Sequence, residues 1–281
     1  MRLLTLLRGE LVRMFAQRGT YVGYILLGAF SGLFVWGVWA EGPPMRDVRH
    51  QFGDDFVVGG TILSGPMVPY LLLDVVPVAV NVFLPLLVSM IAGGLIAGEA
   101  QRGTLRTLLT RPVHRWAVVV AKSLAAFLHA GTLVLFLGAF SLLLGYIVFR
   151  RGDIIAVGDG LTVLAEAEAV QRLGMAYALT AVTMCAVAAI ALFCSAVFVN
   201  PLTAAGVTVG FLIVSVALQV IPYFEWLSPY LLTTHFHAYG QVFKRTVDWA
   251  AVGTDLGYVA AYTGACLAGT LAVFVRRDMT C

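Results

Sequence analysis

Long runs of uncharged, mostly apolar residues alternate with short charged segments along this 281-residue chain. An α-helix rises about 1.5 Å per residue, so roughly 20 apolar residues are needed to cross about 30 Å of hydrocarbon. The longest run, 173–224, is interrupted by Asn200 and Pro201. Because proline lacks an amide donor and disfavours helix in the preceding residue, this pair predicts a hairpin between two spans. The pattern therefore predicts an all-α membrane protein, a single transmembrane domain over 1–281 with six spans at approximately 19–40, 75–98, 117–149, 173–199, 202–224 and 256–275.

The N-terminal segment 1–18 is too charged to cross a bilayer, but its pattern is amphipathic. On a helical projection the apolar face holds Leu3, Leu4, Leu7, Leu11, Met14 and Phe15, and the opposite face holds Arg2, Gly9 and Arg13. This distribution predicts a helix that lies in the headgroup plane before the first span. A signal peptide cleaved after Ala40 is the alternative, which is disfavoured because its apolar core would far exceed the usual length of about 7–15 residues.

Two further uncharged stretches, 56–73 and 226–243, are interrupted by glycine and proline or by histidine and glutamine. Irregular backbone at membrane depth is stable only where protein or water satisfies its polar groups. We therefore interpret both stretches as interfacial or re-entrant segments rather than as additional spans.

Composition supports a membrane location, since 60% of residues are hydrophobic and only 12% are charged, with a mean hydropathy of +0.91. Soluble domains carry about 25% charged residues, so a soluble enzyme and a disordered chain are disfavoured. A net charge of +3 provides no strong field for polyanions, and no nucleic-acid partner is expected. The cysteines show no CxxC pairing and are interpreted as small buried hydrophobic residues: Cys185, Cys194, Cys266 and Cys281.

The basic residues predict the orientation of the six spans. If both termini are cytoplasmic, that side holds 11 basic and three acidic residues, a balance of +8, and the outer side has a balance of −5. Basic residues are enriched in cytoplasmic loops. The expected location is the cell membrane, with both termini in the cytoplasm.

The segment 99–115, between the second and third predicted spans, has an amphipathic pattern of its own. Leu105, Leu108 and Leu109 have helical spacing, while Arg102 and Arg106 form a row on another face. Pro112 ends the predicted helix where the chain turns back to the membrane. The pattern alone permits two interpretations: a basic anchor on the cytoplasmic side, or a docking helix for a cytoplasmic partner.

The residues Gly98-Glu99, Gly103-Thr104-Leu105, Leu108-Leu109, Pro112, Arg115 and Lys122 resemble the signature of type 2 ABC exporter permeases. This resemblance implies a six-span membrane subunit that works with a separate ATPase. It also implies that 99–115 is a coupling helix seated on the ATPase, that 1–18 is an elbow helix, and that 221–230 belongs to a short re-entrant region. The residues expected to couple to the ATPase are Glu99, Arg102, Gly103, Thr104, Leu105, Arg106, Leu108, Leu109, Pro112 and Arg115.

The resemblance further implies an assembly of two ATPase subunits with two copies of this chain, or with one copy and a close relative. Within the chain, Glu99 is expected to pair with Arg102 or Arg106, one turn away, or with the partner. Lys122, near the start of the third span, is expected to reach toward anionic headgroups.

Motifs for catalysis are missing from the sequence. Neither lysine follows a glycine, so no P-loop exists, and the HExxH, GxSxG and GxGxxG patterns do not occur. We therefore predict no catalytic, cofactor-binding or metal-binding residues here, and expect the partner ATPase to bind ATP and Mg²⁺. The pair His235-x-His237 is a weak metal signature and is interpreted as an interfacial polar pair, and the single His129 as a packing residue.

The predicted spans contain few charges but several mildly polar residues: Asn81, Ser89, Thr180, Thr183, Ser195, Thr208, Ser215 and Gln219. Such residues usually form hydrogen bonds across helices. Asn81 and Gln219 are the best candidates for lining a path for a hydrophobic or amphipathic substrate.

Two other functions remain open from the sequence. An ABC-type membrane component could transmit force to an extracytoplasmic partner without moving a solute. A six-span secondary transporter would work without an ATPase, although such proteins generally need charged residues within their spans.

Overall fold

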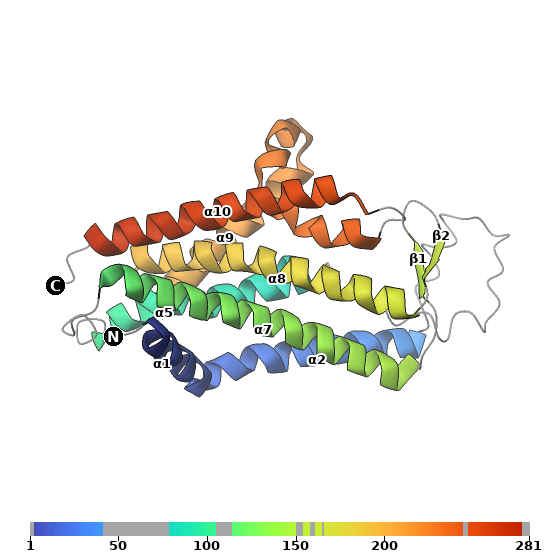
Figure 1. Cartoon of the computed structure of the whole chain (residues 1–281), viewed down its shortest axis with the longest axis horizontal. Helices are drawn as coiled ribbons and strands as arrows, with labels where there is room; N and C mark the ends of the chain where they lie inside the picture. The colour runs from blue at the N-terminus through green and yellow to red at the C-terminus, as the bar shows by residue number, and fades with distance from the viewer. Residues whose placement is uncertain are drawn as a thin grey trace.

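Six long helices run side by side in the computed structural model, which describes residues 3–41, 79–104, 114–149, 154–157, 161–164, 166–243 and 247–276 (Figure 1). Each is long and apolar enough to cross a membrane, as the apolar runs predict. They are α2 (Arg18–Glu41), α5 (Leu84–Gln101), α7 (Arg115–Phe149), α8 (Glu166–Val197), α9 (Pro201–Val220) and α10 (Trp249–Arg276). The predicted membrane fold of six helical spans is therefore confirmed for the described residues.

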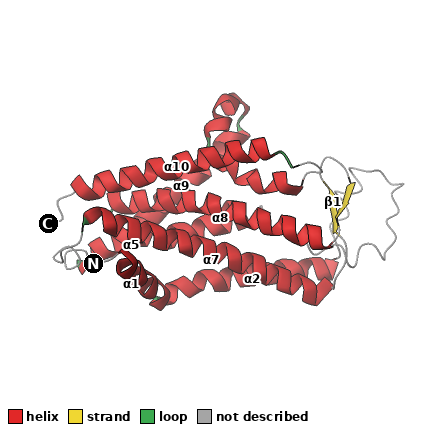
Figure 2. Ribbon diagram, viewed as in Figure 1, coloured by secondary structure: helices red, strands yellow, loops and turns green. Residues whose placement is uncertain are grey.

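Shorter elements complete the fold. A separate helix, α1 (Leu3–Ala16), precedes α2, and a π-helical turn, η1 (Ala79–Phe83), leads into α5. Two 3₁₀ helices, η2 (Pro222–Tyr230) and η3 (Leu232–Phe243), connect α9 to α10. An antiparallel hairpin of β1 (Ile154–Val157) and β2 (Leu161–Leu164), with Ile154 opposite Leu164, lies between α7 and α8 and was not predicted (Figure 2).

The predicted break between the fourth and fifth spans is confirmed. Asn200 adopts an extended backbone and its side-chain oxygen accepts a hydrogen bond from the amide of Leu202 at 2.9 Å, while Pro201 opens α9. Asparagine is a favoured N-cap and proline a favoured first helical residue. The other end of this span differs from the prediction, because Ile221 is extended before Pro222 and residues 222–224 lie in η2.

The helix α8 lies at the centre of the bundle and packs against α5, α7, α9 and α10. In the most apolar 18-residue stretch of α8, 72% of the residues are buried, whereas 17% are buried in the corresponding stretch of α10, which lies at the periphery. Small side chains permit this close packing, since Ala186, Ala188, Ala189 and Ala191 are fully buried. A Cβ added at Gly138 in α7 would lie 2.9 Å from the Tyr177 ring of α8, so a larger residue there would have to displace that ring.

The two ends of the bundle differ in content. The helix α1, the C-terminal end of α5, the start of α7 and the end of α10 lie together at one end, and the β-hairpin lies at the other (Figure 1). The helix α1 packs against α7 and α2. The described parts of the segment that resembles a coupling helix thus share one end of the bundle with α1.

Candidate functional site

The candidate site surrounds the point where α5 ends and the segment 99–115 begins. The amide of Gly103 donates a hydrogen bond to the carbonyl of Ala100 at 3.1 Å, and Gly103 has a φ of +70°. Glycine adopts this left-handed conformation without steric cost, and it is a common way to end a helix. Glu99 is therefore held in the last turn of a rigid helix, immediately before the chain turns.

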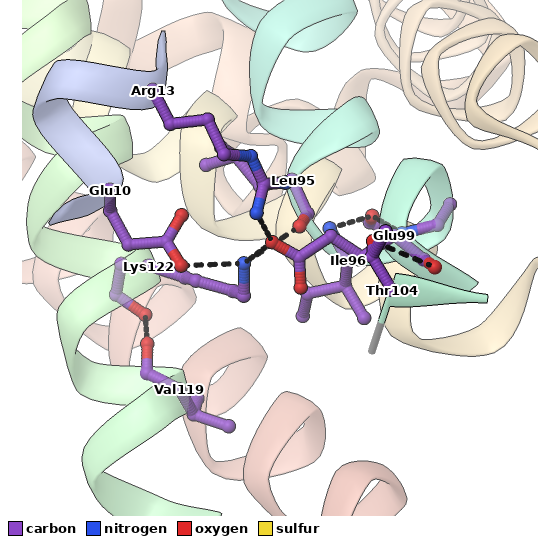
Figure 3. A network of polar contacts seen from close by, with 11 residues as sticks. Glu10, Arg13, Leu95, Ile96, Glu99, Thr104, Val119 and Lys122 are labelled. Carbon is purple, nitrogen blue, oxygen red and sulfur yellow. Dashed lines mark hydrogen bonds and ion pairs between the residues drawn. The ribbon is translucent and has the colours of Figure 1, made fainter. Parts of the chain in front are cut away.

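Four charged side chains from three helices meet at this turn, and we call them the ion cluster: Glu10 and Arg13 of α1, Glu99 of α5 and Lys122 of α7 (Figure 3). The Nζ atom of Lys122 lies 2.6 Å from Oε1 of Glu99 and 3.0 Å from Oε1 of Glu10. The guanidinium of Arg13 pairs with the same oxygen of Glu99. The two positive and two negative charges balance within the cluster.

Lys122 is the most deeply buried member, with a side-chain exposure of 0% against 1% for Glu99. Its third donor bonds to the carbonyl of Leu95 at 3.0 Å. An ammonium has three N–H donors, so each of them has an oxygen partner. Burying a charge is costly unless it is paired and hydrogen-bonded, and this geometry meets both conditions.

The structure corrects the predicted role of Lys122. The amine does not extend to the membrane surface, because α1 packs across the beginning of α7 and presents Glu10 to it. The ion-pair partners of Glu99 among the described residues are Arg13 and Lys122 rather than Arg102. Arg106 lies outside the described residues.

Two charged residues of α1 have contacts that its amphipathic pattern did not predict. The buried residues of this helix are Met14, from the predicted apolar face, and Glu10, which was assigned to neither face, while Leu4 is 75% exposed. Arg13, assigned to the polar face, turns toward Glu99. Glu10 precedes Met14 by four residues and so falls within the apolar stripe. A carboxylate in that stripe, together with a lysine inside the third predicted span, is the sequence pattern that could have revealed the cluster.

The backbone of α5 just before Glu99 is fixed by its neighbours. The hydroxyl of Ser195 in α8 donates to the carbonyl of Gly93 at 2.6 Å and accepts from the amides of Ile96 and Ala97 at 3.1 and 2.8 Å. A Cβ added at Gly93 would lie 3.0 Å from the backbone nitrogen of Ala205 in α9. Both contacts hold α5 tightly against the core at this level.

A second contact fixes the chain at the start of α7, immediately after the segment 105–113. The Nη1 atom of Arg115, the first residue of α7, donates to the carbonyl of Val275 in the last turn of α10 at 2.8 Å. A cation at a helix C-terminus is electrostatically favourable. The segment is thus anchored to α1 and α7 through Glu99 and to α10 through Arg115.

The structure places only some of the predicted coupling residues. Arg102, Gly103 and Thr104 are exposed at the end of α5, and the Thr104 hydroxyl approaches the carbonyl of Glu99 at 3.4 Å. Leu105, Arg106, Leu108, Leu109 and Pro112 lie outside the described residues.

A cavity of about 60 Å³ lies between α1 and α5 beside the ion cluster. Its lining combines polar and apolar side chains: Glu10, Arg13, Met14, Gln17, Met90, Ile91, Gly94 and Leu95. The second carboxylate oxygen of Glu99, Oε2, has no hydrogen-bond partner among the described residues. The volume suffices for water but is far below that of a drug-sized ligand site.

The two predicted path residues lie near the opposite end of the bundle. Asn81 is half-buried in η1, and Gln219 is in the last turn of α9. The amide nitrogen of Gln219 donates to the hydroxyls of Thr233 and Thr234 in η3, the latter at 3.0 Å. Gln219 therefore joins α9 to η3.

Most hydroxyls within the spans bond to their own helix, contrary to the expectation of cross-helix bonds. Ser89, Thr180, Thr183, Thr208 and Ser215 each donate to a carbonyl three or four residues earlier. Serine and threonine in helices commonly reach such carbonyls. The cross-helix prediction holds for Ser195 and Gln219.

His129 is buried against aromatic rings, and the side chain of His237 lies outside the described residues. The ring of His129 packs edge to face against Phe15 and Tyr24, which agrees with a packing role. His235 is paired with Asp255. In the described parts of the chain, no group of three or more His, Cys, Asp or Glu side chains is placed to hold a metal ion.

Comparison with known proteins extends these observations beyond the single chain. A family model described as ABC-2 family transporter protein matches residues 44–279. The uncharacterized protein YhcI of Bacillus subtilis (strain 168) is 30% identical over 151 residues, which are 51% of this chain and 47% of that protein. The chain thus aligns with about half the length of this relative.

Proposed function

The chain belongs to the ABC-2 family of transporter proteins, and we propose that it is the membrane-spanning permease subunit of an ATP-driven exporter. A separate ABC ATPase would bind ATP and Mg²⁺ and hydrolyse the nucleotide. Two ATPase subunits would act on two copies of this chain, or on one copy and a close relative. The multi-pass fold of six apolar helices supports a membrane location, and we place both termini and the segment 99–115 in the cytoplasm.

The observation that carries the proposal is the anchoring of the segment 99–115 at both of its ends. Glu99 bonds to α1 and α7 through the ion cluster, and Arg115 bonds to the end of α10. Because packed helices move as rigid bodies rather than deforming continuously, a displacement of this segment would tilt the elements attached to it. The leucines Leu105, Leu108 and Leu109 would supply the surface that the ATPase holds.

The ion cluster would prevent α1, α5 and α7 from moving independently of one another. A buried pair loses its favourable energy if its members separate, since each charge would then be left uncompensated. The helix α1 must therefore follow α5 and α7 when they move. This is how an elbow helix in the headgroup plane would take part in the motion.

The exported substrate would be hydrophobic or amphipathic, because the described spans present mainly apolar side chains. The side-chain amide of Gln219 is bonded to Thr233 and Thr234, so Gln219 could contact a substrate in the path only if η3 moves during transport. Asn81, half-buried in η1, has no such restriction.

The proposal is tested with the ATPase that copurifies with the tagged full chain from native membranes. Replacing Leu105, Leu108 and Leu109 together by alanine is expected to abolish copurification or to uncouple ATP hydrolysis from the permease. Leu128, Leu135 and Leu143, which are 47%, 70% and 56% exposed on α7, provide a matched control, because their joint replacement by alanine also truncates three exposed leucines, outside the segment 99–115. Unchanged assembly and coupled ATPase activity in the triple variant would contradict the coupling role.

Addition of candidate amphipathic solutes to the reconstituted complex tests the exporter assignment separately. Solute-stimulated ATP turnover with movement of the solute supports export. Coupled turnover without movement of any solute would instead indicate force transmission to an extracytoplasmic partner.

A further inference from the structure

His235, in η3, faces an oxygen atom with each of its two ring nitrogens. Nδ1 is 2.7 Å from Oδ1 of Asp255 in α10, and Nε2 is 3.1 Å from the carbonyl oxygen of Pro229 in η2. The residue is only 4% exposed. Its ring stacks on Tyr258 of α10, with centroids 4.4 Å apart and an interplanar angle of 11°. One side chain therefore joins three elements of the end that lies away from α1.

The two contacts impose a condition on the protons. A carbonyl oxygen only accepts hydrogen bonds, so Nε2 must carry a hydrogen to bond Pro229. A carboxylate oxygen also only accepts, so Nδ1 must carry a hydrogen to bond Asp255. Neutral imidazole has only one N–H, and it satisfies one of these contacts while pointing a lone pair at the other oxygen.

We propose that His235 and Asp255 form a proton-binding site and that the bound proton closes a clasp between η2, η3 and α10, which we call the proton clasp. The proton resides on the imidazole, because the face of the Tyr258 ring favours a cation stacked against it. The opposite charge of Asp255 further stabilises the imidazolium. This inference does not rest on the proposed transport function.

Among the side chains of η3 that the structure describes, His235 is the group whose protonation would control the clasp. Burial raises the pKa of Tyr239, also in η3, to about 12, so that phenol stays protonated and neutral. Asp255 and Tyr258 of α10 contact the ring itself, and the Tyr230 ring of η2 lies 6.5 Å from that of Tyr258. Glu225 of η2 is exposed, and the Tyr262 hydroxyl of α10 bonds to the carbonyl of Tyr230. On α8, Glu168 pairs with Arg172, which bonds to the carbonyl of Val242 at the far end of η3. From α9, η3 receives the uncharged amide of Gln219.

The direction of the pH effect follows from the protonation condition. At low pH the imidazolium makes both bonds and the clasp is closed. As the pH rises the proton leaves, the bond to Pro229 or to Asp255 is lost, and η2 and η3 loosen against α10. Bonds from Gln219 to Thr234 and from Tyr262 to the carbonyl of Tyr230 do not depend on this proton, so the segment loosens without unfolding.

The substitution Asp255→Asn separates the two hydrogen bonds of the clasp from the proton that is proposed to close it. Its side-chain amide can donate to an unprotonated Nδ1 while Nε2–H donates to Pro229, so both bonds form with a neutral imidazole. The variant should therefore keep the clasp closed at every pH between 5.5 and 8.0, a range that spans ordinary histidine titration.

The experiment measures amide hydrogen exchange of residues 222–243 in the full chain in lipid nanodiscs, for wild type and Asp255→Asn. Position 255 lies outside the reporter segment, so the intrinsic chemical exchange rates are identical in the two proteins and cancel in their ratio. Expected are equal rates at pH 5.5 and about tenfold faster exchange in wild type at pH 8.0, the effect of losing one charge-assisted hydrogen bond. A ratio that stays constant between the two pH values, whatever its size, overturns the proposal.

A control and a second measurement keep the test decisive. His114→Gln removes an exposed histidine before α7 and should leave the wild-type pH response unchanged. Nitrogen NMR of the wild-type chain with ¹⁵N-labelled histidine, in which His235 is assigned by its loss in His235→Gln, should show both ring nitrogens protonated at pH 5.5. A neutral ring at that pH would also refute the proton clasp.

Discussion

The ion cluster and the proton clasp are both buried polar sites that join three elements, yet they use different charges. The cluster pairs two carboxylates with a lysine and an arginine, Lys122 and Arg13. The clasp pairs one carboxylate with His235. Lysine and arginine remain charged at physiological pH, whereas histidine is the side chain whose charge changes there. The first site is therefore permanent and the second conditional.

Their positions match this difference. The permanent cluster holds α1, α5 and α7 together beside the segment that we propose to contact the ATPase, where loss of a connection would interrupt transmission. The proposed clasp holds η2, η3 and α10 together, away from that segment. Under the two proposals, the ion cluster would keep its three helices moving as a unit, and the clasp would let its three elements change their connections.

The largest expected effect is on the permanent site. Replacing Lys122 by methionine keeps most of the side-chain volume but leaves Glu10 uncompensated in a buried position. We expect a loss of about 3–5 kcal/mol in the free energy of unfolding, as for other broken buried ion pairs. Denaturant unfolding in detergent micelles measures it. As a control, Glu168→Gln removes an exposed pair with Arg172 and should cost below about 1 kcal/mol. Similar losses in both variants would show that the cluster is not a buried network.

The second prediction separates charge pairing from packing. Combining Glu99→Leu with Lys122→Met leaves one carboxylate, Glu10, and one guanidinium, Arg13, at a spacing on α1 that allows them to pair, and places apolar side chains in an apolar region. Relative to the single lysine variant, we expect a recovery of about 2 kcal/mol, because paired apolar replacements remove the uncompensated charge. A double-mutant cycle on unfolding free energies measures the coupling. Strict additivity of the two single changes would contradict a direct bond between these residues.

The third prediction concerns the backbone of α5. Ser195→Ala removes a hydroxyl that contacts three backbone groups of α5, and we expect a loss of about 1–2 kcal/mol in unfolding free energy. Ser215→Ala is the matched control, since that hydroxyl bonds only within its own helix and should have a smaller effect. The reverse order of the two effects would show that Ser195 does not fix α5.

The smallest predicted change in stability is at the far end of the segment 99–115. Arg115→Gln weakens one partly exposed hydrogen bond to Val275, so the unfolding free energy should fall by less than about 1 kcal/mol. The ATPase activity coupled to the permease should fall more clearly, because α10 is no longer tied to the start of α7. If stability and coupling stay at wild-type values together, the second anchor has no role.

The sequence predicted what depends on local pattern. The apolar runs gave the six spans, Asn200 and Pro201 gave the break between two of them, and the Glu99–Arg115 motif resembled the family that the whole chain matches. These features are set by residues close together in the chain.

Features that depend on distant residues were missed. Lys122 was expected at the lipid headgroups because nothing local pairs with it, and its partner Glu10 lies 112 residues away. Arg13 was placed on the polar face of α1 by helical projection alone, and its partner Glu99 lies in a different helix. The proton clasp depends on Asp255, a carboxylate 20 residues from His235 in a different helix. The sequence drew attention to His237 instead, because it lies two residues from His235.

The most direct test of the central claim is photo-crosslinking from the segment 99–115 to the ATPase in intact membranes. A photoreactive amino acid at position 108 is predicted to yield a covalent adduct with the copurifying ATPase chain, and one at position 135, which is exposed in the middle of α7, to yield none. An intact complex in which position 108 gives no ATPase adduct would contradict the account.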